Sequence, residues 1–167
     1  MHFEIASKQR IGNEIATRQE AEIYFRSEDS GGIEDSLING LVTLARETME
    51  RAINRALVSH EVICYASNWK GFLPFGPIDH ESIQSDNMIT VQGNSYPYVI
   101  VGEDHTQITY ETECYISGEL KNAVLELAAY WYDRGIAEKS SSIGSNYSEI
   151  PSKLKPIIAL HKLRFSF

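Results

Sequence analysis

The chain has 167 residues, of which 43% are hydrophobic and 10% aromatic, and its formal net charge is −8. This length and composition indicate one globular domain of ordinary size and exclude an intrinsically disordered chain. The acidic balance argues against a protein that wraps nucleic acid by neutralising phosphates, and no apolar run approaches the ~20 residues of a membrane-spanning helix.

A cap and a periodic pattern mark the first two helices in chain order. The N-terminal stretch before them shows little period and lacks the apolar core of a signal peptide. Thr17 and Glu20 have the spacing of a capping box, which predicts a short helix to about Phe25. Residues 27–32 break that helix. Apolar residues on one face then predict a long amphipathic helix over about 33–54.

A β-rich segment follows, from about residue 57 to residue 115. Short runs of β-branched and aromatic residues predict strands, and turns rich in Gly, Pro, Asn and Asp separate them. The stretch 71–77 predicts a rigid extended turn, because each proline fixes its own φ and keeps the preceding residue extended. The predicted strands cover residues 57–66, 83–91, 98–101 and 106–115.

Residues 119–135, ELKNAVLELAAYWYDRG, predict a helix that is apolar on more than one side. Asn122, Glu126 and Asp133 form one narrow polar stripe, whereas a lone surface helix would carry charges on its flanks too. Two explanations stay open at this point. Either the helix is central in a monomeric bundle, or its extra apolar flank contacts a second copy of the chain. The candidate subunit-interface residues are Leu120, Val124, Leu125, Leu127, Trp131 and Tyr132.

The C-terminal part is predicted to be a linker followed by a basic arm. Residues 136–149 are Ser-rich without a strong period, which is typical of a flexible linker. Pro151 suits the first position of a final helix, and Pro156 makes that helix short, kinked or shifted toward itself. The arm, residues 150–167, either packs on its own bundle or docks on an acidic partner. The candidate docking residues are Lys153, Leu154, Lys155, Ile157, Ile158, His161, Lys162 and Arg164.

Helices, a β insertion and then further helices predict a mainly α, α+β fold. We expect a small bundle of three to four helices with an inserted short antiparallel sheet or hairpin, all within residues 1–135. No GxSxG, Walker, GxGxxG or HExxH motif occurs, and the two cysteines, Cys64 and Cys114, lie outside any CxxC motif. The sequence therefore gives no reason to expect a catalytic residue, a cofactor or a metal.

The order of these features resembles the head–tail connector adaptor family of tailed bacteriophages, over about residues 17–134. In that family a strand ending in a tyrosine leads to a helix that closes on an aromatic residue, a tyrosine, an acid or amide, and an arginine. The chain departs from the family pattern at Cys114, where the family often has Gly, and at Ser117, where it often has Pro. The matching pieces are Leu73–Ile78, Ile108–Tyr115 and Ala123–Arg134.

The resemblance implies a structural protein without catalytic residues. In that family the protomers form a ring, usually twelve-fold, which docks under the portal of the filled capsid and extends the DNA channel toward the tail. We therefore expect a homo-oligomer with the portal protein and a head-closure or tail-completion protein as partners. DNA would pass through without specific binding, no membrane would be involved, and the protein would be located in the virion neck after synthesis in the bacterial cytoplasm.

Under this resemblance the helix 119–135 would pack on the neighbouring subunit, and the basic arm would dock on the portal. Acids of the β insertion would face the channel, repel phosphates and let the duplex slide; solubility is the ordinary alternative reason for them. The candidate channel-lining residues are Glu103, Asp104, Glu111 and Glu113. Three other interpretations remain: another phage neck component, a small cytoplasmic enzyme, or a protein-binding module with the aromatic stretch 69–77 as its groove.

Overall fold

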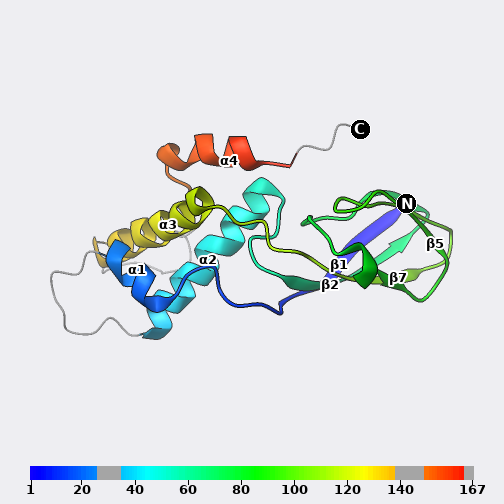
Figure 1. Ribbon diagram of the computed structural model, residues 1–167, viewed down its shortest axis with the longest axis horizontal. Coiled ribbons are helices and arrows are strands. Elements are labelled where there is room, and N and C mark those ends of the chain that lie inside the picture. The colour runs from blue at the N-terminus through cyan, green and yellow to red at the C-terminus, as the bar shows by residue number, and fades with distance from the viewer. Residues whose placement is uncertain (26–34, 138–148, 164–167) are drawn as a thin grey trace. The chain divides into compact units, whose positions relative to one another are not determined.

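A computed structural model describes residues 1–25, 35–137 and 149–163 (Figure 1). Most of the predicted linker, the predicted helix break at 27–32 and the candidate docking residue Arg164 lie outside these ranges. The chain divides into two compact units, and each combines separate stretches of sequence. The β unit comprises residues 1–13, 54–115 and 163–167, and the helical unit comprises residues 14–53 and 116–162.

The β unit contains two antiparallel sheets. The first has the order β1-β2-β7-β4, and the second has the order β3-β6-β5. Where a single short sheet was predicted, the described residues therefore form two. The strands are β1 (His2–Arg10), β2 (His60–Ser67), β3 (Trp69–Phe72), β4 (Gln84–Ser85), β5 (Ile89–Gln92), β6 (Tyr98–Val101) and β7 (Thr106–Glu111), with a 3-10 turn, η1 (His80–Ser82), before β4.

Alternation of side chains builds the core of the β unit. Every second residue of β2 and of β7 is buried, as a half-buried strand requires. Tyr110 is buried and its hydroxyl donates a hydrogen bond to the Pro74 carbonyl at 3.2 Å, which ties β7 to the turn after β3. Burial raises the pKa of the Cys64 thiol to about 12, so this cysteine stays neutral. Cys114 is an exposed free thiol.

Strand β1 was not predicted, and its place in the sheet explains why. It pairs with β2 along one edge only, and most of its side chains are exposed. Its register shifts between Ile5 and Ser7, which interrupts the alternation from which strands are recognised. Phe3 and Lys8 are the half-buried exceptions: the Phe3 ring stacks on Trp69 at 4.4 Å between centroids, and the Lys8 ammonium lies over the Phe75 ring. An exposed edge strand with a register shift carries almost no periodic signal.

The helical unit follows the sequence prediction closely where that prediction used caps and periodicity. The Thr17 capping box is confirmed: the Glu20 backbone N–H donates to Thr17 Oγ1 at 3.3 Å, and the Thr17 N–H donates to Glu20 Oε2 at 2.9 Å. The final helix begins next to Pro156 rather than at Pro151, which was one of the predicted possibilities. The helices are α1 (Arg18–Tyr24), α2 (Asp35–Ile53), α3 (Gly118–Ala137) and α4 (Lys155–His161), with a 3-10 turn, η2 (Ser152–Leu154), before α4.

Helices α1, α2 and α4 all pack against α3. The predicted α+β mixture is confirmed. Among the residues that the structure places, no helix is both long and apolar enough to cross a membrane. Within the same ranges, no group of three or more His, Cys, Asp or Glu side chains could hold a metal ion.

Stability of the α1 cap is expected to depend on pH through Glu20. The hydrogen bond from Lys121 Nζ, and then those from Thr17, lower the pKa of Glu20 to about 2. A carboxyl group whose pKa is lowered on folding stabilises the fold above its ordinary pKa, and this contribution is lost as the pH falls toward 2. We expect Glu20→Gln to lower the melting temperature at pH 7, and the difference from the wild type to vanish near pH 2. Circular dichroism melts from pH 7 to pH 2 measure this, and an unchanging difference would contradict it.

Candidate functional site

The six predicted interface residues of α3 are covered by the chain's own helices. Five of them are at most 2% exposed. The sixth, Tyr132, is half-buried, and its ring packs edge-on against the Phe25 ring at 5.0 Å between centroids. The apolar width of α3 therefore has an explanation within one protomer, and the argument that a second copy must cover it loses its premise. These residues are Leu120, Val124, Leu125, Leu127, Trp131 and Tyr132.

The predicted basic arm also packs on its own helical unit. Leu154 is 1% exposed, and Ile157 and Ile158 are half-buried. Two polar contacts fix the segment to α3. Lys153 Nζ lies 2.9 Å from Glu126 Oε2, and His161 Nε2 lies 3.0 Å from Glu119 Oε2. The apolar stripe of the described part of the arm therefore packs within the protomer, while Lys155 and Lys162 stay exposed.

The outer face of α4 carries a different set of residues. Lys155 and Ala159 are exposed at i and i+4 on one side of the helix, and the exposed Lys162 is the residue that follows its last turn. Leu160 is 73% exposed and lies about 140° around the helix from Lys155. We call these four residues the outer face of α4. It combines two cations with one large apolar side chain.

The four candidate channel-lining acids form two separate pairs. All four are exposed. Glu103 and Asp104 precede β7, whereas Glu111 ends it and Glu113 follows. A rise of about 3.3 Å per residue puts the two pairs about 20 Å apart along the strand. The structure thus brings the members of each pair together but not the two pairs.

Three further acids, which sequence reasoning missed, join these pairs. Asp79 and Glu81 lie next to the end of β7, since the Asp79 backbone N–H donates to the Glu111 carbonyl at 3.0 Å. Near the start of the strand, Asp86 Oδ1 accepts the Gln107 backbone N–H at 2.8 Å. One signal in the sequence could have revealed this surface. Residues 71–115 contain seven acids and not one Lys or Arg.

A buried charge cluster holds the start of the helical unit on α2. Arg46 is 2% exposed and Glu50 is fully buried. Arg46 Nε donates to Glu14 Oε1 at 2.8 Å, and its Nη1 donates to Glu50 Oε2 at 2.9 Å. Burial alone would raise the pKa of Glu14, but the Ile15 N–H, the Arg46 charge and the Thr43 hydroxyl outweigh it and lower that pKa. The cluster has a structural role, and the i, i+4 spacing of Arg46 and Glu50 was its sequence signal.

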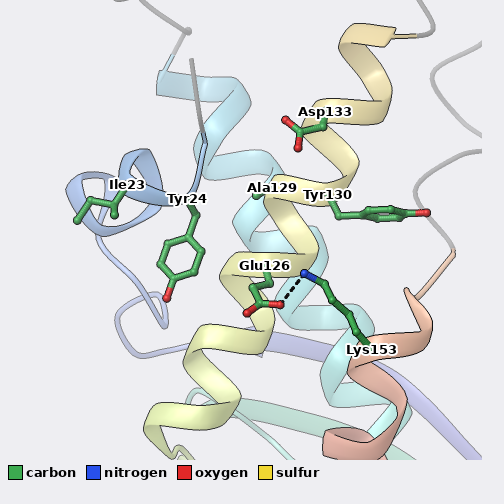
Figure 2. A pocket seen from close by; sticks show the side chains of 7 residues that line it. All are labelled: Ile23, Tyr24, Glu126, Ala129, Tyr130, Asp133 and Lys153. Atoms are coloured by element: carbon green, nitrogen blue, oxygen red, sulfur yellow. Dashed lines mark ion pairs between the residues drawn. The ribbon is translucent and has the colours of Figure 1, made fainter. Parts of the chain in front are cut away.

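A hollow of about 440 Å³ lies over α3 in the helical unit. In Figure 2, Ile23 and Tyr24 of α1 lie on one side of this hollow. Lys153 reaches in from the other side toward Glu126. Asp133 lies farther along α3, and its side chain has no hydrogen bond or ion pair with any residue in the described ranges. We call this hollow the α1–α3 groove. Its lining residues are Ile23, Tyr24, Glu126, Ala129, Tyr130, Asp133 and Lys153.

Comparisons with known proteins agree on one kind of relative. The model of a family described as "Phage gp6-like head-tail connector protein" matches residues 27–162. A chain of the solved "Neck of empty GTA particle computed with C6 symmetry" superposes with a TM-score of 0.65 at 14% identity, covering 100% of this chain and 98% of that one. A chain of the "Virion of native gene transfer agent (GTA) particle" gives 0.60 at 14% identity, with the same coverage. No curated protein matches at a significant level. At such low identity the two structural likenesses establish a shared fold.

Proposed function

Because this chain belongs to the phage gp6-like head–tail connector family, we propose that it is a structural protein of the particle neck, where its copies form a ring around the DNA channel. The family match carries this proposal, since it spans most of the chain and includes segments of both units. The two structural relatives, from a gene transfer agent neck and virion, support it.

The proposed ring has twelve copies, sits between the portal protein and a head-closure or tail-completion protein, and lets DNA pass without binding it specifically. The C6 symmetry named for one structural relative is compatible with twelve copies, because six divides twelve. The residues that carry the proposed function are structural, and we assign no catalytic role to any of them. A head-closure or tail-completion role in the same neck is the second candidate, which the two sheets of the β unit favour.

Cryo-electron microscopy of the full chain mixed with the portal protein tests the adaptor role. We expect a closed ring, coaxial with the portal and in direct contact with it. A chain that contacts only a preformed portal–adaptor assembly would favour the second candidate instead. Particles that join heads to tails normally without this chain would contradict both.

We propose that the acids around β7 line the channel. All four predicted members are exposed, and the acids that flank them raise the local density of negative charge. If the axis of β7 runs along the channel, the two pairs face the duplex at two levels about 20 Å apart. Like charges on the wall and on the DNA phosphates keep the duplex from adhering to the wall.

Reversing these charges is therefore expected to slow DNA ejection. Particles that carry Glu103→Lys, Asp104→Lys, Glu111→Lys and Glu113→Lys together should assemble, because none of these side chains is buried. Their ejection should slow by about tenfold at low salt and recover in high salt, since phosphate contacts weaken as counterions compete. Fluorescence measurement of ejected DNA gives the rate. Normal ejection at every salt concentration would show that these acids do not face the duplex.

A further inference from the structure

A ring built head to tail needs two different complementary patches on every protomer. The burial of the predicted α3 residues leaves these patches to be found elsewhere on the chain. Two surfaces of the helical unit remain open and differ in character: the α1–α3 groove and the outer face of α4. Both belong to the same unit, so a single copy presents them together.

The groove has an exposed isoleucine on one side and a carboxylate that has no partner among the described residues. Ile23 is 78% exposed on the α1 side, and Ala129 forms part of the floor at 9% exposure. Lys153 already neutralises Glu126 at 2.9 Å. The Asp133 side chain has no such partner among the described residues, and Figure 2 shows it farther along the same helix. The groove therefore fits an apolar side chain that is accompanied by a cation.

The outer face of α4 has this complementary chemistry. Leu160 is 73% exposed, and the side chains of Lys155 and Lys162 form no ion pair with any residue in the described ranges. The inner face of α4 is already occupied, because Leu154, Ile157 and Ile158 pack on the chain's own helices. Helix α4 is thus held on one side and exposes Lys155 and Leu160 elsewhere, with the exposed Lys162 just beyond its end, so it has a surface for a second contact.

The lengths of the two surfaces match as well. The groove floor runs along α3 from Glu126 to Asp133, which is about 10 Å at 1.5 Å per residue. The seven residues of α4 also span about 10 Å. A helix of this length covers the floor from end to end.

We infer that the outer face of α4 docks in the α1–α3 groove of a second copy of this chain. This inference rests on the proposed ring and names the contact that closes it. Leu160 packs against Ile23 and Ala129 of the next copy, and Lys155 or Lys162 pairs with its Asp133. Each copy inserts its α4 into the groove of one neighbour and binds the α4 of the other neighbour in its own groove. The contact therefore repeats from copy to copy, and it forms a closed ring when the rotation between copies permits.

Charge reversal on each side tests the contact. Asp133→Lys changes the groove, and Lys155→Glu with Lys162→Glu changes the helix. Each variant alone should weaken association of copies by at least about tenfold, because like charges then meet. An equal mixture of the two variants should restore rings of alternating copies, since the new lysine of one faces the new glutamates of the other. Glu4→Lys, an exposed acid of the β unit that contacts only His2 among the described side chains, is the matched control and should leave association unchanged.

Native mass spectrometry of the full chain, alone and mixed with portal protein, measures the copies per assembly, and circular dichroism confirms that each variant is folded. Rings of wild-type strength from every variant would overturn this contact and leave the proposed function intact. The contact would also be overturned if the variant Lys155→Glu with Lys162→Glu formed normal rings that no longer bind the portal. The outer face of α4 would then be a portal surface. A wild-type chain that binds neither itself nor the portal would overturn the proposed function too.

Discussion

Replacing Arg46 by alanine is expected to destabilise the helical unit by about 3–5 kcal/mol, which is a large fraction of the stability of an ordinary domain. The guanidinium is 2% exposed and donates to Glu14 and Glu50. Its removal leaves Glu50, which is fully buried, beside a cavity and without that counter-charge. A buried carboxylate that loses its arginine partner costs more than a missing contact, because it keeps the desolvation penalty after losing that attraction.

Urea unfolding followed by the helical circular dichroism signal measures this loss. Arg51→Ala is the matched control, because it removes an exposed arginine from the same helix and should cost no more than about 0.5 kcal/mol. A second variant tests the cause. Arg46→Met combined with Glu50→Leu removes both buried charges, and we expect it to be more stable than Arg46→Ala alone. If the double variant is no better, loss of packing rather than the lost charge partner of Glu50 explains the effect.

Trp131→Ala is expected to have a comparable effect, about 3–5 kcal/mol, through the core of the same unit. The indole is fully buried on α3, and its Nε1 donates to the Glu149 carbonyl at 3.0 Å. Alanine therefore creates a cavity and also releases the backbone just before η2. Because η2 leads directly into α4 through the buried Leu154, the loss should spread to the C-terminal helix.

Trp131→Phe separates the two contributions. It keeps most of the ring and loses the N–H donor, so we expect a smaller cost of about 1–3 kcal/mol. Hydrogen exchange at the backbone amides of α4 reports whether the C-terminal helix loosens. A Trp131→Ala protein whose midpoint in urea lies within error of the wild type would show that the indole is not part of the core.

Local chemistry made the helices predictable. The hydroxyl of Thr17 and the carboxylate of Glu20 satisfy backbone N–H groups within one turn, so the start of α1 follows from four residues. Strand β6 was predicted with its observed bounds, Tyr98–Val101, because turn residues flank it on both sides. Strand β1 gave no such signal, since an exposed edge strand has no buried face to fix an alternation.

Which elements cover one another could not be predicted in the same way. The periodicity of α3 showed that Leu125 and Trp131 avoid water, but not whether another chain or the same chain covers them. In the structure the chain's own α1, α2 and α4 do so. Likewise, Leu160 on the short α4 has no periodic context, although it is one of the most exposed large apolar residues of the helical unit. Only the exposure of each side chain in the folded protein shows that the chain itself covers Leu125 and Trp131 but leaves Leu160 exposed.

The interleaving of the two units fixes the order in which they can be completed during synthesis. The first two segments of the β unit have left the ribosome once residue 115 has emerged, whereas α2 must still wait for α3 to cover its apolar face. Domains fold as their sequence emerges from the ribosome, at about 5–20 residues per second. We therefore expect both sheets to resist protease on stalled nascent chains that expose residue 117, while α2 on the same chains is still cleaved.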